Sequence, residues 1–173
     1  MLKKLTIKNF TLIENIEILF QDGLVVITGE TGAGKSIIIN AIQLLLGNKG
    51  ETAYIREGKD FAVIEGCFQM NQQTKKKALD LGIVCQSDEL WIIRQLNRSG
   101  KNRILMNEQT VTLKELQEIS SSLIDIHGQH KHQSLFDESS HIVYFDEVGD
   151  YRILLNKYAL ELEKYSGLKE KFL

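Results

Sequence analysis

Proline is absent from the 173-residue sequence, and no apolar run is long enough to span a membrane. The lack of proline favours uninterrupted helices and excludes a proline-rich linker. The N-terminal sequence MLKKLTIKNF lacks the apolar stretch of a signal peptide. We therefore expect a soluble, cytoplasmic protein with no membrane partner.

Cysteine is scarce, and neither sign of charge dominates. The two cysteines, Cys67 and Cys85, are not spaced as metal ligands, and we expect both to be reduced thiols. The net charge of −2 gives no general support for a nucleic-acid partner, although it permits a local basic patch. Apolar residues make up 43% and charged residues 25%, which is typical of a globular domain.

Alternating apolar and polar residues predict strands near the N-terminus, over residues 2–9 and 12–20. Residues 24–28 are apolar throughout, which is typical of a central strand covered on both faces. A helix is predicted over 35–46, ending at Gly47.

The middle of the chain continues as a mixture of strands and helices. A capping box that begins at Thr112 and ends in Glu115 opens one of the helices. The other predicted elements are a strand over 61–70, a polar helix over 71–81, a hairpin of 89–96 with 103–106, and a short strand over 123–126.

Apolar residues recur at alternating spacings of three and four near the C-terminus, as in a heptad repeat. The pattern predicts either the start of a coiled coil or an amphipathic helix docked on the domain. It stops without a helix cap, so we expect the polypeptide to continue beyond it. The positions are Val148, Tyr151, Leu155, Tyr158, Leu162, Tyr165 and Phe172, interrupted by Lys169.

The sequence GETGAGKS, from Gly29 to Ser36, matches the phosphate-binding pattern G-x-x-x-x-G-K-[ST]. Glycines let the backbone N–H groups turn toward a phosphate, and the following helix adds its positive N-terminal end. Lys35 would reach the β- and γ-phosphates, and the Ser36 hydroxyl would ligate Mg²⁺. The motif therefore predicts a nucleoside triphosphate and Mg²⁺ as ligands.

The N-terminal 47 residues resemble the first half of an ABC-type ATPase head of the SMC and recombination-repair group. Within that group, the chain is most similar to the RecN family of bacterial DNA repair proteins. Three further segments carry this resemblance: 55-IREGKDFAVIEGCF-68, 99-SGKNRILMNEQTVTLKELQEI-119 and 123-LIDIHGQHKHQSLF-136. The family commonly has Asn-Gly where this chain has Asn107-Glu108, so we expect a different turn there.

The resemblance implies an α/β fold, the N-terminal lobe of a P-loop ATPase head. In such a lobe a mixed sheet surrounds a central P-loop strand and helix, antiparallel strands are added to it, and a coiled-coil helix begins at its end. The lobe would span residues 1–147 and the helix 148–173. The implied site contains Gln129 as a Q-loop residue near Mg²⁺ and, more loosely, Arg56, for which a solvated surface role is an open alternative. The nucleotide-binding residues would be Gly29, Glu30, Thr31, Gly32, Ala33, Gly34, Lys35 and Ser36.

By the same resemblance, the chain is the ATP-binding lobe of an ATPase in DNA double-strand-break repair and recombination. ATP-driven dimerisation of heads would gate engagement of double-stranded DNA, and the protein would be nucleoid-associated. Its partners would be the C-terminal half of the same head, a second head and DNA. Two alternatives are another SMC-like or helicase-type P-loop ATPase, and a coiled-coil tethering module whose loop merely binds anions.

Three motifs of a complete ABC head are missing from the sequence: a Walker B run, a serine-glycine-rich signature and a switch histidine. Phe145-Asp146-Glu147 only mimics the end of a Walker B run, because few apolar residues precede it. We therefore expect the chain alone to bind nucleotide weakly and to hydrolyse almost none.

Histidine, basic and aromatic residues offer further candidates. His127, His130, His132 and His141 could suggest zinc, but the favoured interpretation is that His130 or His132 contacts phosphate, water or the partner lobe. Trp91 is expected in the core rather than as a base-stacking platform. The basic residues form a run on the polar helix, at Lys75, Lys76 and Lys77, and a group at the hairpin, at Arg94, Arg98, Lys101 and Arg103. The usual explanation is a solvated face, and contact of the hairpin group with DNA phosphates is the alternative.

Overall fold

The computed structural model describes residues 1–29, 33–124 and 151–172, together with residues 126, 142, 145, 146, 148 and 149. The chain separates into two compact units, residues 1–125 and 126–173. The boundary between residues 147 and 148 inferred from the resemblance stays a prediction.

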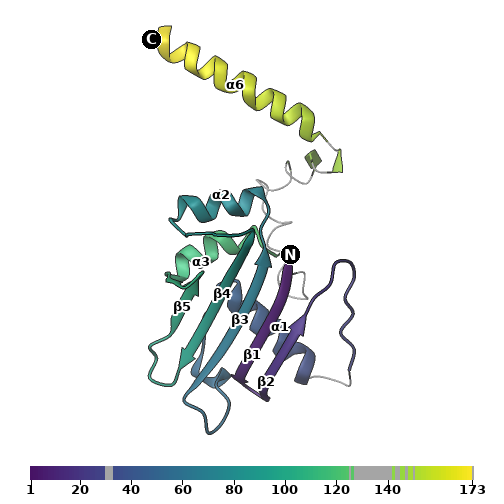
Figure 1. Cartoon of the computed structure of the whole chain (residues 1–173), viewed down its shortest axis with the longest axis vertical. Coiled ribbons are helices and arrows are strands. Elements are labelled where there is room, and N and C mark those ends of the chain that lie inside the picture. Colours follow the sequence, from purple (N-terminus) through teal and green to yellow (C-terminus); the bar gives the residue numbers. More distant parts are fainter. Residues whose placement is uncertain are drawn as a thin grey trace. The chain divides into compact units, whose positions relative to one another are not determined.

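An antiparallel sheet of six strands forms the larger unit, in the order β2-β1-β3-β4-β5-β6 (Figure 1). The register pairs Ile7 with Ile16 on one side of β1 and with Ile64 on the other. The strands are β1 (Leu2–Phe10), β2 (Ile13–Leu19), β3 (Phe61–Gln69), β4 (Glu89–Asn97), β5 (Arg103–Met106) and β6 (Gln109–Thr110).

Within the described part of the larger unit, three α-helices and one short 3-10 helix accompany the sheet. The Asn71 side chain caps α2 by accepting a hydrogen bond from the Thr74 N–H at 2.8 Å. The predicted capping box of Thr112 and Glu115 is formed at the start of α3. The helices are α1 (Ala33–Leu45), η1 (Thr52–Tyr54), α2 (Gln72–Asp80) and α3 (Leu113–Ser120).

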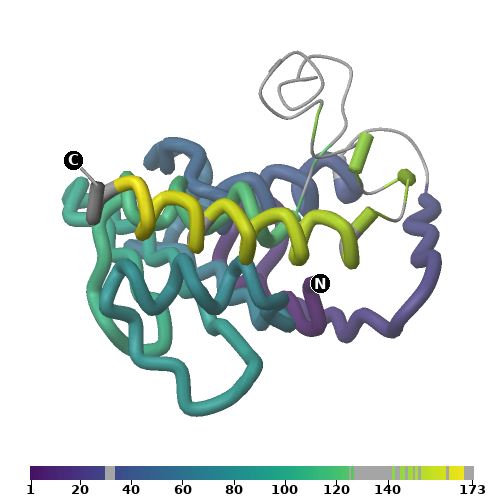
Figure 2. Tube along the Cα trace, turned by 90° about the horizontal axis from the view of Figure 1, so that it is seen from above, coloured from purple at the N-terminus to yellow at the C-terminus, as the bar shows by residue number. Residues whose placement is uncertain are grey.

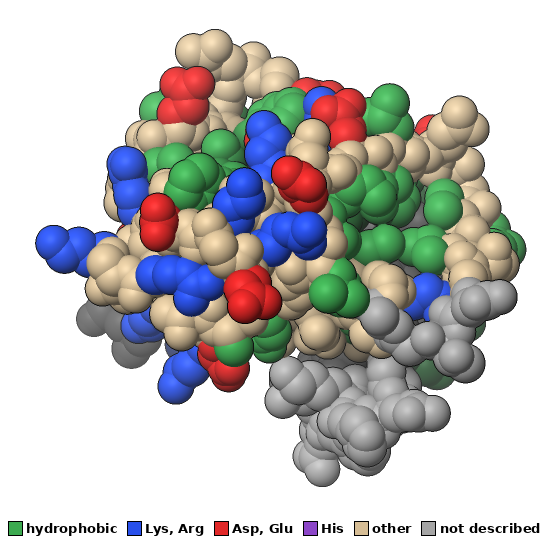
Figure 3. All heavy atoms as spheres, turned by 90° about the horizontal axis from the view of Figure 1, so that it is seen from below, with side chains coloured by type: hydrophobic (Ala, Val, Ile, Leu, Met, Phe, Trp, Pro, Cys, Tyr) green, Lys and Arg blue, Asp and Glu red, His purple; other side chains and the backbone are tan. Residues whose placement is uncertain are grey.

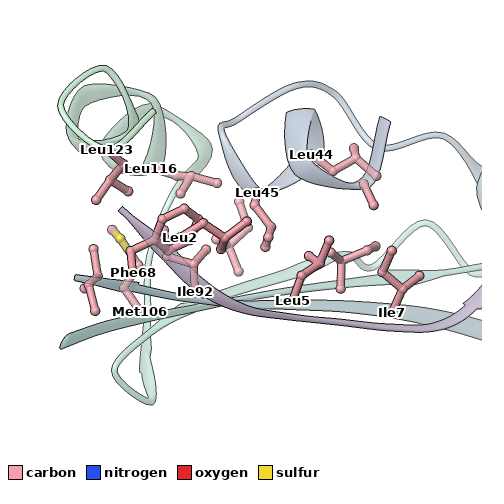
Figure 4. Packing of buried hydrophobic residues seen from close by; sticks show 14 of the residues in the cluster. Leu2, Leu5, Ile7, Leu44, Leu45, Phe68, Ile92, Met106, Leu116 and Leu123 are labelled. Atoms are coloured by element: carbon pink, nitrogen blue, oxygen red, sulfur yellow. The ribbon is translucent and has the colours of Figure 1, made fainter. Parts of the chain in front are cut away.

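One face of the sheet packs against α1 and α3. Leu44 and Leu45 of α1 point toward the strands, as does Leu116 of α3 (Figure 4). All three side chains are at most 1% exposed, as are Phe68 and Ile92 beneath them. The alternation of buried and half-buried residues along β3 and β4 follows from this one-sided packing.

The predicted strand over residues 24–28 is wrong for this structure. After β2 the chain leaves the edge of the sheet as a loop (Figures 1 and 2), and no strand is assigned to these residues. Leu24, Val25, Val26 and Ile27 are 91%, 47%, 70% and 44% exposed. A strand that is apolar on both faces needs partners on both sides, and no described strand pairs with this segment. The described sheet is therefore antiparallel throughout, and the predicted strand over 123–126 is likewise absent from its described residues.

The turn between β5 and β6 also differs from expectation. Asn107 and Glu108 both have positive φ angles, 44° and 67°, as both central residues of a type I′ hairpin turn do. Asparagine tolerates this conformation readily, whereas glutamate is strained by it. The type I′ turn is therefore formed even though Glu108 stands where the family commonly has glycine.

The predicted helix near the C-terminus is α6 (Arg152–Phe172), which belongs to the smaller unit. Its heptad positions Leu155, Tyr158, Leu162 and Tyr165 are 40%, 66%, 48% and 62% exposed. The coiled coil stays a prediction. Within the described ranges, no helix combines the length and apolar character needed to cross a membrane.

Candidate nucleotide-binding site

The predicted phosphate-binding loop leads into α1. Gly34, Lys35 and Ser36 lie in its first turn, and the ammonium group of Lys35 donates a hydrogen bond to the carbonyl oxygen of Gly29. This contact brings together the first glycine and the lysine of the motif. Glu30, Thr31 and Gly32 lie outside the described residues, as does the side chain of Ala33.

The start of α1 suits a polyanion. Its first turn contains no acidic residue, and the N–H groups at the start of a helix carry partial positive charge. The Ser36 side chain is exposed, and a Cβ added to Gly34 would meet no atom within 4 Å. Lys35 would supply a full positive charge to a bound triphosphate, and Ser36 a hydroxyl ligand to its Mg²⁺. The described residues therefore fit both ligands.

The opposite end of α1 is held by Arg94, which the sequence grouped with exposed basic residues. Arg94 is only 2% exposed. Its Nη1 donates to the Leu44 carbonyl at 2.9 Å, and its Nη2 to the Asn48 carbonyl at 3.3 Å. Burial lowers the pKa of Arg94 to about 10, so the guanidinium is still charged at neutral pH. Arg94 thus ties β4 to the carbonyl end of the helix that begins in the phosphate-binding loop.

Arg56 joins two loops at one end of the sheet. Its Nη1 donates to the Leu12 carbonyl at 2.6 Å, while its own carbonyl accepts a bond from Arg98 Nη2 at 3.2 Å. Arg98 Nε also donates to the Lys59 carbonyl at 2.6 Å. The guanidinium of Arg56 is therefore used within the fold, and its role toward nucleotide stays a prediction.

The remaining basic residues fall into two groups. Lys75 pairs with Asp88 at 2.7 Å, and Lys77 Nζ bonds to Ser121 Oγ at 3.0 Å, which links α2 to the end of α3. By contrast, Lys59, Arg98, Lys101 and Arg103 are exposed around the loops near Arg56. Figure 3 shows Lys and Arg side chains gathered on one part of the face seen from below, with acidic residues between them.

Several predicted residues cannot be placed. Gln129 and the four histidines lie outside the described residues. Among the residues that the structure does describe, no group of three His, Cys, Asp or Glu side chains could hold a metal ion. Phe145 and Asp146 are helical, and Phe145 is 70% exposed, which does not fit the buried strand of a Walker B run. Trp91 is half-buried on the sheet face opposite α1 rather than in the core.

Comparison with known proteins identifies the family of the chain. A family model for an AAA domain matches residues 4–172. The DNA repair protein RecN of Halalkalibacterium halodurans is 41% identical over 99% of this chain, which covers 31% of that relative. RecN of Bacillus subtilis is 38% identical over 99% of the chain and 30% of its own length. The chain thus spans about a third of the length of these relatives.

Solved structures show the same fold. The SMC head domain from Thermotoga maritima superposes with a TM-score of 0.52 at 30% identity, covering 68% of this chain and 41% of that one. An SMC ATPase described by its ATP-driven dimerization and DNA-stimulated activation gives a TM-score of 0.57 at 24% identity, covering 70% and 78% of the two chains. The predicted α/β head-lobe fold and the resemblance to RecN are therefore confirmed: the chain belongs to the AAA domain family and matches RecN over the part of that protein that it covers.

Proposed function

We propose that the chain is the ATP-binding lobe of a RecN-like, SMC-related ATPase that acts in DNA double-strand-break repair and recombination. The observation that supports this most strongly is the joining of Gly29 to Lys35 at the start of a helix free of acidic residues in its first turn. ATP would place its β- and γ-phosphates at the backbone N–H groups of the loop and of the first turn of α1, with Mg²⁺ near Ser36 and Gln129.

Water would attack the γ-phosphate in line, with Lys35 neutralising charge that develops on the phosphate oxygens. A base to activate that water would come from the other half of the head. A complete head is needed for a second reason, because Leu24–Ile27 expose four aliphatic side chains in sequence. We propose that this segment becomes the central strand when the C-terminal half of the head packs against it.

We also propose that the complete heads dimerise and engage DNA. The SMC ATPase with the same fold is described as dimerising in an ATP-driven manner and as stimulated by DNA. The exposed basic residues around Arg98 could neutralise DNA phosphates, and the uncovered heptad positions of α6 could pair with a second helix. The tethering alternative would use only α6, and it would leave the anion-binding loop without a catalytic role.

A comparison of the chain with the full-length protein tests the proposed completion of the head. We expect negligible steady-state ATP hydrolysis by the chain alone and clear hydrolysis by the full-length protein. Val26→Asp should abolish hydrolysis by the full-length protein, because a carboxylate cannot be buried in a central strand without a large cost. The same substitution should leave the thermal stability of the chain unchanged, since Val26 is 70% exposed there.

Leu79→Asp is the matched control, because Leu79 is 76% exposed on α2 and has no part in the proposal. It should leave hydrolysis by the full-length protein unchanged. Full activity of the Val26→Asp protein would show that residues 24–27 do not form a buried strand. Hydrolysis by the isolated chain at the rate of the full-length protein would show that no second half is needed.

A further inference from the structure

A hollow lies on the face of the sheet opposite α1, where β3 and β4 present alternate side chains outward. Its volume is about 480 Å³, and Trp91 and Ile93 of β4 line it together with Glu65 of β3 and Glu89. Such a volume lies in the range of small-ligand pockets. None of the described residues of the phosphate-binding loop lines the hollow.

The rim of this hollow is fixed by hydrogen bonds. Asn107 Oδ1 accepts a hydrogen bond from the backbone N–H of Trp91 at 2.9 Å, while Asn107 Nδ2 donates to the Val84 carbonyl at 3.0 Å. The Val84 N–H donates in turn to Gln109 Oε1 at 2.7 Å. These bonds join β4, the turn after β5 and the segment before β4, so the walls are in place before any ligand arrives.

The lining of the hollow is acidic and aromatic. Glu65, Glu89 and Glu108 contribute three carboxylates, and no lysine or arginine of the described residues is part of the lining. Two lysines of neighbouring segments are engaged in ion pairs: Lys4 of β1 with Glu17 at 3.0 Å, and Lys75 with Asp88, which precedes Glu89, at 2.7 Å.

The thiol of Cys67, two residues after Glu65 on β3 and opposite Trp91 in the sheet register, responds to the negative charge of these carboxylates. Burial, followed by the negative charges of Glu89 and Glu65, raises the pKa of Cys67 to about 11. A cation entering the hollow would meet the opposite situation, since the same carboxylates would stabilise its charge.

We propose that this hollow receives a lysine or arginine side chain from a basic segment of a partner protein. A cation held over the indole of Trp91 gains from the electrons of the ring, and the three carboxylates supply the counter-charge. Val84 is 60% exposed at the rim and offers apolar contact to the residues that flank the cation. Nucleic acid is disfavoured because its phosphates would face these carboxylates.

Trp91 is the only tryptophan of the chain, so its fluorescence reports directly on the hollow. The probe is a short peptide, acetyl-Ala-Arg-Leu-Arg-Ala-amide, titrated into the chain alongside the same peptide with citrulline in place of arginine. We expect a saturable change in fluorescence with the arginine peptide. Binding of the citrulline peptide should be weaker by about tenfold or more, because a charge-assisted contact is lost.

Paired carboxylate variants separate a specific pocket from general attraction. Glu65→Gln with Glu108→Gln should weaken binding of the arginine peptide about tenfold, whereas Glu14→Gln with Glu118→Gln, which changes two exposed carboxylates away from the hollow, should leave it within about twofold. Equal weakening by both pairs, or no saturable signal, would overturn the proposal. Spermidine binding as tightly as the peptide would also overturn it, since the occupant would then be a free polyamine. Lys35→Ala should not alter peptide binding, so failure of the nucleotide site would be seen separately.

Discussion

Replacing Arg94 with alanine should lower the free energy of unfolding of the chain by about 2–4 kcal/mol. The guanidinium donates to the carbonyls of Leu44 and Asn48 at the end of α1, and both bonds would be lost. The Asn48 carbonyl would lose its bond to Arg94, whereas the Leu44 carbonyl would still accept from the Gly47 N–H at 3.1 Å, in a region where the Arg94 side chain is only 2% exposed. Relief of the cost of burying a charge offsets part of this loss. Urea denaturation of the two proteins measures the difference.

Two further variants identify the cause of the Arg94 effect. Arg103→Ala removes an exposed arginine from the neighbouring strand and should change stability by no more than about 0.5 kcal/mol. Arg94→Met keeps most of the volume but donates no hydrogen bond, and it should be less stable than the parent protein. Parent-like stability of Arg94→Met would contradict the assigned role, because packing alone would then explain the alanine result.

Adding a single methyl group at Gly66 should destabilise the chain by about 1–3 kcal/mol. A Cβ at this position of β3 would lie 2.7 Å from Leu45 Cδ1 and 2.8 Å from Phe68 Cε2. Both of those side chains are fully buried, so neither can move without disturbing its neighbours. We expect Gly66→Ala to force α1 away from the sheet, which thermal unfolding would detect as a lower Tm.

Gly167→Ala adds the same methyl group where no atom lies within 4 Å. It should leave the Tm of the larger unit unchanged and should favour α6, since alanine is a better helix former than glycine. If Gly66→Ala were as stable as the parent protein, the close approach of α1 to β3 would not limit the residue at this position.

The sequence predicted most of the described elements because their patterns are local. The alternation in β3 and β4 reflects a sheet with one covered face, and the capping box of Thr112 needs only residues within one turn of a helix. The strand predicted over residues 24–28 is wrong for a physical reason. The apolar composition of this segment is typical of a strand buried on both faces, but such burial needs neighbouring strands and helices that no described part of the chain supplies.

The role of Arg94 could have been predicted from the sequence. Arg94 alternates with Leu90, Ile92 and Leu96, so it belongs to the buried face of β4, but its charge led to its being grouped with Arg98. Trp91 lies between these alternating positions, so its side chain is on the other face of the sheet. The acidic hollow had no comparable signal, because it combines Glu65, Trp91 and Glu108 from separate segments that only the sheet register brings together.

Titration of a fluorescent ATP analogue into the chain, with and without Mg²⁺, tests the nucleotide site most directly. We expect saturable binding that Mg²⁺ strengthens and that Lys35→Ala weakens by about tenfold or more, because the ammonium group of Lys35 supplies a full charge to the triphosphate. Lys49→Ala, which removes an exposed lysine just after α1, should leave the affinity unchanged. Binding that is indifferent to both Mg²⁺ and Lys35→Ala would contradict a triphosphate site at the start of α1 and would favour the tethering module.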